Sequence, residues 1–565
     1  MLLDIKDLIV KYGEIQALNG ISIQAQEGQL TVLIGSNGAG KSTLLKMFKR
    51  ELTPYGTREG QIFYCGTPLE ELDAYVSCGE IGYVMQSPEQ QIVTDKVWSE
   101  LTFGMENLGY SRERMRLRAG ETASYFGIQN LFRRETATLS GGQKQLLNLA
   151  SVMAMSPKVL LLDEPTSQLD PIAAGEFMTT LKKLNQELGL TILLIEHRLE
   201  EVMPLADRVL VMKEGRAVMY DTPQAVCARM KDDGLQRAFP AAVRIFHALG
   251  GDGVCPMTVR EGREYLEQHF KAENHRETAD TGRRENSRTL QKAENREAPE
   301  PVLSLENVWF RYEKDGSDIL RGVELTVGQG ELFGIVGGNG SGKTTTLMVM
   351  AGLQKPYRGS VRLHGRKLRS YKPADLYRHC LAVLPQNPQT VFIHNTVRED
   401  LEEMCMALHD TKEQMEDKIT EVGRKIKIEH LFNKHPYDLS GGEQQLCAIA
   451  KVLLSEPEVL LLDEPTKGID VEGKQRLADI LQQLKKEGVT MIMVTHDVEF
   501  AAENADRCGL FFDGEILAAA EPVSFFAENH FYTTAAGRMS RGCFDHVVTV
   551  EQLIQRCRGQ EKKYE

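Results

Sequence analysis

The chain has no hydrophobic run long enough to cross a membrane. Its longest apolar stretches, such as residues 159–162 and 191–195, have the length of single strands, whereas a membrane-spanning helix needs about 20 apolar residues. The first residues, MLLDIKDLIVKYG, include an early acid and no small-residue cleavage site, so we expect no signal peptide. These absences argue against an integral membrane protein.

Surplus positive charge and paired cysteines are also missing. Lys and Arg total 67 against 80 Asp and Glu, which gives a net charge of -13 and argues against the basic surface of a nucleic-acid binder. The ten cysteines form no CxxC pair, so we interpret them as reduced thiols of a cytosolic protein. The hydrophobic content of 42% is ordinary for a soluble globular protein.

The chain does contain a long internal repeat. GSNGAGKS, LSGGQ and LLLDEP in the first half return as GGNGSGKT, LSGGE and LLLDEP in the second. Gln86 and Gln386 stand between the first two motifs, and His197 and His496 follow the third, at matching places in the two halves. Matched order and spacing over five motifs indicate a duplication, so the 565 residues are interpreted as two large domains with smaller attachments.

The glycine-rich motif stands in the same context in both halves. Apolar runs at 30–34 and 332–336 lead into it, and helical sequence follows at 42–48 and 344–350. A strand, a Gly-rich loop and a helix in this order are what a phosphate-binding P-loop requires. Further buried strands, separated by helical sequence, predict an α/β fold with a mostly parallel sheet.

The P-loop residues suit phosphate binding because glycines let backbone N–H groups wrap the phosphates. The ammonium groups of Lys41 and Lys343 would bind the β- and γ-phosphates. The hydroxyls of Ser42 and Thr344 would bind Mg²⁺. The predicted nucleotide-binding residues of the two loops are Gly35, Ser36, Asn37, Gly38, Ala39, Gly40, Lys41, Ser42 and Thr43, and Gly337, Gly338, Asn339, Gly340, Ser341, Gly342, Lys343, Thr344 and Thr345.

Two acids follow each LLL strand. Asp163 and Asp463 close the strands and are expected to hold Mg²⁺. Glu164 and Glu464 come next, and successive side chains of a strand point in different directions. One acid can therefore serve the metal while the other faces the attacking water.

These motifs together resemble the ATP-binding cassette (ABC) ATPases over about 430 residues, because LSGGQ and LSGGE match that family's signature. The resemblance implies two tandem P-loop ABC ATPase domains, each with a mostly parallel sheet and a helical signature subdomain, that bind ATP and Mg²⁺ and hydrolyse ATP. It also implies head-to-tail pairing of the two domains. Ser440, Gly441 and Gly442 would then complete the Lys41 site, and Ser140, Gly141 and Gly142 the Lys343 site.

The resemblance assigns further roles. Tyr12 and Tyr312 would stack on adenine. The implied catalytic residues are Glu164, Glu464, His197, His496, Gln86 and Gln386, and the implied metal ligands are Ser42, Gln86, Asp163, Thr344, Gln386 and Asp463. Asp170 and Asp470 match the D-loop of the family. Gln143 is replaced by Glu443, which places a carboxylate beside one signature.

Composition sets the expected boundaries. Residues 271–300 hold fourteen charged residues, seven of each sign, and one large hydrophobe, Leu290, which is typical of a disordered linker. The predicted organisation is a first ABC domain at 1–228, a helical extension at 229–270, a disordered charged linker at 271–301, a second ABC domain at 302–525 and a C-terminal extension at 526–565.

Residues 83–109, YVMQSPEQQIVTDKVWSELTFGMENLG, are similar to the segment that follows the Q-loop glutamine in energy-coupling factor (ECF) importers. That resemblance implies a motor for vitamin or transition-metal uptake at the cytoplasmic face of a prokaryotic membrane. Its partners would be an ECF-type coupling protein and a substrate-binding membrane protein. A twin-cassette ATPase of another importer and a soluble tandem ABC protein acting on ribosomes stay open as alternatives. The acidic composition and the charge-balanced linker disfavour the ribosomal one.

Overall fold

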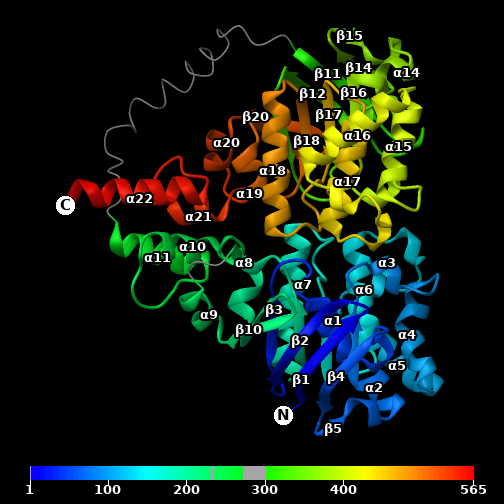
Figure 1. Ribbon diagram of the computed structural model, residues 1–565, viewed down its shortest axis with the longest axis vertical. Coiled ribbons are helices and arrows are strands. Elements are labelled where there is room, and N and C mark those ends of the chain that lie inside the picture. The colour runs from blue at the N-terminus through cyan, green and yellow to red at the C-terminus, as the bar shows by residue number, and fades with distance from the viewer. Residues whose placement is uncertain (1, 231–233, 271–300, 565) are drawn as a thin grey trace. The chain divides into compact units, whose positions relative to one another are not determined.

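The computed structural model describes residues 2–230, 234–270 and 301–564. Their contacts divide the chain into two compact units, Met1–Thr258 and Val259–Glu565. Each unit contains one copy of the repeat (Figure 1). The predicted linker at 271–301 lies outside the described residues except for Pro301, so its predicted disorder stays a prediction.

The first unit is built on a six-stranded sheet with the order β10-β9-β3-β8-β7-β6. All neighbouring strands are parallel except β9 and β10, which are antiparallel. The strands are β3 (Leu30–Ile34), β6 (Ile81–Val84), β7 (Val159–Asp163), β8 (Thr191–Ile195), β9 (Arg208–Lys213) and β10 (Arg216–Asp221). Every residue of β3, β7 and β8 is buried, which confirms the mostly parallel sheet and explains the uninterrupted apolar runs.

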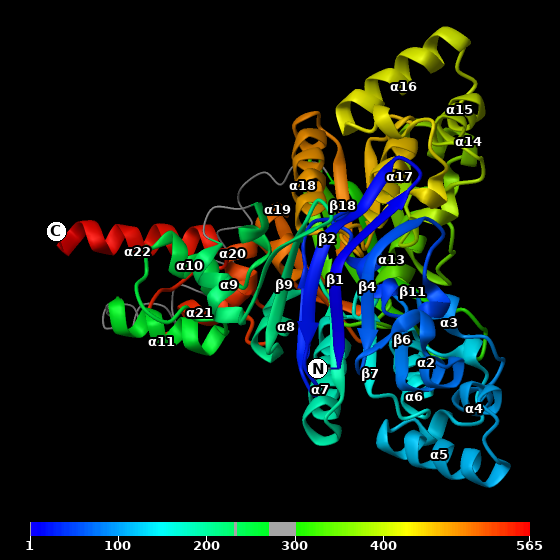
Figure 2. The same ribbon diagram turned by 60° about the horizontal axis from the view of Figure 1, so that its bottom comes forward.

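A second, antiparallel sheet accompanies the first, with the order β2-β1-β4-β5. Its strands are β1 (Leu3–Tyr12), β2 (Ile15–Ala25), β4 (Thr57–Tyr64) and β5 (Thr67–Pro68), and Figure 2 shows β1, β2 and β4 side by side. The sequence indicated a strand at the start of the chain but not this separate sheet. Exposed residues interrupt the buried ones along β1 and β2, as expected of strands with one solvated face.

The helices of the first unit range from four residues in α3 to eighteen in α7. They are α1 (Lys41–Met47), α2 (Ala74–Glu80), α3 (Pro88–Gln91), α4 (Val97–Asn107), α5 (Arg112–Tyr125), α6 (Gly141–Met153), α7 (Pro171–Leu188), α8 (Leu199–Val202), α9 (Pro223–Arg229) and α10 (Ala241–Ala248). Helices α3, α4 and α5 each contact α6, and α6 begins at the signature. These four helices form the predicted helical signature subdomain.

The second unit repeats both sheets. Its orders are β16-β17-β18-β13-β19-β20 and β12-β11-β14-β15. The strands are β11 (Pro301–Phe310), β12 (Leu320–Gly328), β13 (Leu332–Val336), β14 (Arg358–Leu363), β15 (Arg366–Lys367), β16 (Leu381–Leu384), β17 (Val459–Asp463), β18 (Thr490–Thr495), β19 (Arg507–Phe512) and β20 (Glu515–Ala520). The duplication read from the motifs therefore holds for the whole topology.

The helices of the second unit follow the same plan, with additions at its two ends. They are α11 (Val259–His269), α13 (Lys343–Met350), α14 (Pro373–Asp375), α15 (Val397–Ala407), α16 (Lys412–Ile426), α17 (Gly441–Leu453), α18 (Val471–Lys486), α19 (Val498–Asn504), α20 (Pro522–Glu528), α21 (Ala535–Ser540) and α22 (Val550–Tyr564). Helix α11 precedes the second copy of the repeat in the chain but packs against α21.

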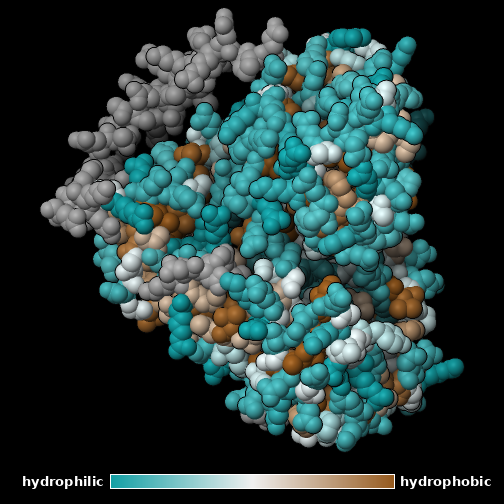
Figure 3. Space-filling model, viewed as in Figure 1, coloured by the Kyte–Doolittle hydropathy of each residue, from teal (hydrophilic) through white to brown (hydrophobic). Residues whose placement is uncertain are grey.

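No helix within the described ranges is long and apolar enough to span a membrane. On the face drawn in Figure 3, hydrophobic residues are scattered among hydrophilic ones.

Candidate active site

Three neighbouring parallel strands position the predicted residues of each unit. In the first unit β3 leads into the P-loop, β7 ends at Asp163, and β8 is followed within two residues by His197. Strand β8 pairs with both β3 and β7, so the three carboxyl ends meet at one edge of the sheet. Strands β13, β17 and β18 repeat this arrangement in the second unit. Such an edge is where α/β proteins bind ligands.

The P-loops curl around their own lysines. Lys41 Nζ donates hydrogen bonds to the carbonyls of Gly35 (2.8 Å) and Ser36 (2.9 Å). Lys343 Nζ makes the same two bonds to Gly337 (3.0 Å) and Gly338 (2.8 Å). Both lysines are 5% exposed, so each ammonium is held inside the loop that would surround the phosphates.

The residue before each lysine must be glycine. Gly40 caps α1 with φ 93°, and Gly342 caps α13 with φ 113°, a region that side chains rarely adopt. A Cβ on Gly40 would lie 2.6 Å from the carbonyl oxygen of Ala17. Both the backbone conformation and the space therefore require glycine at this point.

A hydroxyl and a carboxylate meet where Mg²⁺ was predicted. Ser42 Oγ donates to Asp163 Oδ1 (2.9 Å), and Thr344 Oγ1 donates to Asp463 Oδ1 (3.1 Å). Burial raises the pKa of both aspartates, that of Asp463 to about 6. Among the described residues no group of three or more His, Cys, Asp or Glu could hold a metal ion. The pair suits Mg²⁺, which takes few protein ligands and completes its shell with phosphate oxygens and water.

Glu164 is held from two sides. Gln86 Nε2 donates to Glu164 Oε2 (2.7 Å), and His197 Nε2 lies 2.8 Å from Glu164 Oε1. The residue has a left-handed backbone, φ 47°, and its N–H donates to the Ile195 carbonyl at the end of β8 (3.0 Å). Backbone strain of this kind clusters at functional sites. The structure thus brings together three residues that the sequence assigned to catalysis.

Glu464 has the same strained backbone, φ 48°, but different partners. The backbone N–H of His496 donates to Glu464 Oε2 (3.1 Å), and His496 Nδ1 lies 2.8 Å from the same oxygen. Gln386 is exposed and makes no hydrogen bond within the described part of the second unit. The second site therefore joins glutamate and histidine but leaves the predicted glutamine apart.

The signature residues lie on the helical subdomain, at the helix starts of α6 and α17. Ser140 and Ser440 are the N-caps, and each forms a capping box with the residue three positions later. Both serine hydroxyls accept from the N–H three positions later, Ser140 from Gln143 (3.3 Å) and Ser440 from Glu443 (3.4 Å). The two boxes differ in one bond, because Ser440 Oγ also donates to Glu443 Oε2 (2.7 Å).

The remaining predicted residues occupy defined places. Asp170 and Asp470 cap α7 and α18 by accepting from Ala173 and Gly473. Tyr312 is 60% exposed, and its hydroxyl lies 3.1 Å from Thr345 Oγ1. Tyr12 is half-buried and packs against the core of its unit. Stacking of these tyrosines on adenine stays a prediction.

Two further residues belong to the first site and were not predicted from the sequence. The Tyr83 hydroxyl donates to Asp163 Oδ2 (3.1 Å). Glu196 is buried and accepts hydrogen bonds from the N–H (3.0 Å) and the hydroxyl (2.7 Å) of Thr166, which stands two residues after Glu164. The repeat carries no signal for either residue, because Val383 and Thr495 stand at the matching positions.

Comparison with known families gives a match to the ABC transporter family over residues 18–167 and 320–467. The chain is 42% identical to a protein of Bacillus thuringiensis subsp. konkukian that is named as an ABC transporter ATP-binding protein, over 96% of this chain and 95% of that one. A protein of Methanosarcina acetivorans with the same name is 33% identical, over 91% of this chain and 85% of that one.

Among solved structures, the chain is similar to cbiO1 from Clostridium perfringens, described as part of the ABC transporter complex cbiONQ. The identity is 34% and the TM-score 0.38, over 40% of this chain and 91% of that one.

Proposed function

Because this chain belongs to the ABC transporter family of ATP-binding proteins, we propose that it is the motor subunit of an ABC importer of the energy-coupling factor type. It is an ATPase with two cassettes in one chain. As such a motor it would lie at the cytoplasmic face of a prokaryotic membrane, bound to a coupling protein and a substrate-binding membrane protein.

In the proposed reaction, water attacks the γ-phosphorus and the bond to the bridging oxygen of the β-phosphate breaks. Lys41 and Lys343 hold the β- and γ-phosphates, while Glu164 and Glu464 orient the water and accept its proton. His197 and His496 keep these glutamates in place and face the γ-phosphate. Mg²⁺ held by Ser42 and Asp163, or by Thr344 and Asp463, would neutralise charge that develops on the phosphate oxygens.

We also propose that the two cassettes pair head to tail within one chain. Each signature serine stands at a helix start, where backbone N–H groups favour an anion. A signature loop can therefore offer donors to a γ-phosphate bound by the other cassette. Ser440 would then serve the Lys41 site, and Ser140 the Lys343 site.

One observation carries the importer proposal: the segment after Gln86 offers an apolar surface that is connected to the catalytic acid. Val93, Trp98 and Phe103 are 67%, 44% and 40% exposed on this segment and on α4. At its start Gln86 donates to Glu164. A membrane partner bound to this surface could therefore shift Gln86 and so control the position of Glu164.

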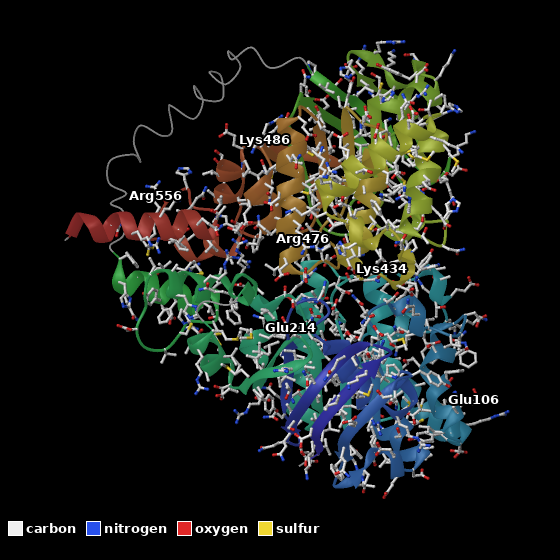
Figure 4. The ribbon with its side chains drawn as sticks, viewed as in Figure 1. Glu106, Glu214, Lys434, Arg476, Lys486 and Arg556 are labelled. Atoms are coloured by element: carbon white, nitrogen blue, oxygen red, sulfur yellow. The ribbon has the colours of Figure 1, made fainter. Side chains whose placement is uncertain are left out.

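Hydrogen bonds fix the segment to α4. Buried Glu100 on α4 accepts hydrogen bonds from the N–H groups of Val93 (3.1 Å) and Thr94 (2.9 Å) and from the Thr94 hydroxyl (2.8 Å). Glu106, labelled in Figure 4, marks the exposed far end of the same helix.

The second cassette presents a different surface at this place. Ile393 and Met406 are exposed there, and buried Asp400 pairs with Lys451 (2.9 Å) instead of accepting from a threonine. Two different surfaces fit two docking sites that are not identical, as a coupling protein without internal symmetry would offer.

The test is purification of the chain from membranes with its bound proteins, for the wild type and for Trp98→Glu with Phe103→Glu. We expect the wild type to bring down membrane proteins that stimulate its ATPase, and the double variant to lose them while its basal ATPase stays within about twofold, because exposed substitutions perturb stability little. Leu188→Glu, an exposed apolar residue on α7, is the matched control and should retain the partners.

Association of the wild type with ribosomes instead of membranes would contradict the proposal and favour the soluble tandem class. Retention of the membrane partners by the double variant would refute the assigned surface.

A further inference from the structure

Each cassette anchors the first helix of the extension that follows it. The N–H of Ala241, at the start of α10, donates to Glu200 Oε2 (2.9 Å). The N–H of Ala535, at the start of α21, donates to Glu499 Oε1 (2.6 Å). Both glutamates stand three positions after the histidine of their cassette. The duplication thus extends into regions where the motifs gave no signal.

The helix after α10 does not stay with the first cassette. Helix α11 follows α10 by ten residues, 249–258, yet it belongs to the second compact unit and packs against α21. Figures 1 and 2 both show α11 beside α21.

The contact between α11 and the C-terminal extension is a packed one. Gly262, Leu266 and Phe270 are spaced by four residues and are all buried, which is the pattern of one helix face against a core. Arg260 and Glu264 form an ion pair on the opposite, exposed face. The helix is therefore amphipathic, with its apolar face buried and its charged face exposed to solvent.

The C-terminal extension supplies the other side. Ala536 and Met539 of α21 are buried, as are Cys543 and Phe544, which follow it. The rings of Phe270 and Phe544 lie 6.2 Å apart. Arg263 of α11 donates to the carbonyl of Arg538 in the last turn of α21 (2.5 Å).

The C-terminal extension is also packed and hydrogen-bonded to the second cassette. Thr533 and Thr534 are buried, and their hydroxyls donate to the carbonyls of Phe526 and Val548, each at 2.6 Å. Phe526 and Val548 belong to the core of the second unit. Leu553 and Cys557 of α22, the helix that carries Arg556 in Figure 4, are buried as well. The platform under α11 is thus continuous with the second cassette.

We propose that α11 is a clasp: a segment from the first half of the chain that locks into the C-terminal extension and ties the two halves together without nucleotide. Residues 271–300 then join α11 to β11, two elements of the same unit. A cut within them would open a loop inside the second unit and would leave the connection between the halves intact. If residues 271–300 alone held the two halves together, the same cut would separate them.

The clasp is tested on the full chain with a protease site inserted between Arg283 and Arg284. After complete cleavage, size-exclusion chromatography with light scattering is run without nucleotide and with a metal chelator. We expect a single species with the mass of the whole chain over a roughly hundredfold dilution, because a packed interface does not depend on the cut peptide. Separation into two fragments would overturn the clasp.

Two variants sharpen the result. Leu266→Asp with Phe270→Asp should let the cleaved fragments separate at a protein concentration at least about tenfold higher than for the cleaved wild type. Arg260→Ala with Glu264→Ala, on the exposed face, should behave as wild type. Cleaved fragments of the aspartate variant that stay together like the wild type would overturn the proposal.

Hydrogen exchange on the intact chain gives an answer that needs no variant. Amides of α11 should be protected without nucleotide to the same degree as those of α21, and rapid exchange of α11 alone would contradict the clasp. Both measurements exclude ATP. Their outcome is therefore independent of whether the cassettes pair on ATP or serve an importer.

Discussion

The two cassettes carry the same motifs but hold their catalytic carboxylates differently. Glu164 is contacted by Gln86 on one oxygen and by His197 on the other, and its side chain is 12% exposed. Both contacts of Glu464 come from His496 and reach one oxygen, and its side chain is 5% exposed. Identical letters in a motif thus do not guarantee an identical hydrogen-bond network.

Two further differences point to the same asymmetry. Asp163 accepts from Ser42 and Tyr83, whereas Val383 stands at the second position and offers no donor to Asp463. The signature serines also differ, since only Ser440 donates its hydroxyl to a neighbouring carboxylate. We therefore expect two working sites with unequal rates.

The largest effect should come from removing both carboxylates. Glu164→Gln with Glu464→Gln should bind ATP and hydrolyse it at least roughly a hundredfold slower, because a general base contributes about 10² to 10⁴ in rate. Steady-state phosphate release and equilibrium nucleotide binding check this. Glu176→Gln with Glu472→Gln, on exposed positions of α7 and α18, is the control, and near-normal turnover of the active-site variant would sink the assignment.

The glutamines should then separate the two sites. In a Glu464→Gln background, Gln86→Ala should lower the remaining ATPase about tenfold, because a hydrogen bond to a charged group contributes about 1.5–3 kcal/mol. In a Glu164→Gln background, Gln386→Ala should lower it less than about threefold, because that glutamine does not hold the carboxylate. Equal losses of ATPase activity in the two backgrounds would show that the hydrogen bond from Gln86 to Glu164 does not affect catalysis.

The signature carboxylate should give the smallest effect. Glu443→Gln releases the Ser440 hydroxyl to donate to phosphate, and a neutral hydrogen bond of about 1 kcal/mol corresponds to a roughly fivefold gain. With cross-pairing, the gain should appear in the Glu464→Gln background and not in the Glu164→Gln background. Glu413→Gln, at the exposed start of α16, should change neither rate, and a gain in the wrong background would count against cross-pairing.

The parts of the fold that the sequence predicted are those with strong periodic signals. The five-residue runs of β3 and β13 were located to the residue because both are buried on two faces. The antiparallel sheets were not foreseen, since strands such as β4 pair far along the chain and mix exposed with buried residues. The packing of α11 against α21 could not be predicted for a related reason. An apolar face of three residues indicates that a helix is buried but not which element it packs against.

The site residues that could be predicted from the sequence are those whose chemical role ties them to a recognisable motif. Lys41, Asp163, Glu164 and His197 share one sheet edge, as the repeat indicated. Tyr83 was not predictable, because a tyrosine in a buried strand ordinarily reads as core and only its bond to Asp163 shows otherwise. The separation of Gln386 from Glu464 could not be predicted either, because it depends on side-chain geometry and not on motif spacing.

The most direct test of the account is native mass spectrometry of ATP retained by chains that combine two site lesions, in the Glu164→Gln and Glu464→Gln background. Lys41→Ala with Ser440→Arg damages one cross-paired site, so we predict one ATP on a particle with the mass of one chain. Lys41→Ala with Ser140→Arg damages both, so we predict none. The reverse pattern, or a particle of two chains, would contradict intramolecular pairing of the two cassettes.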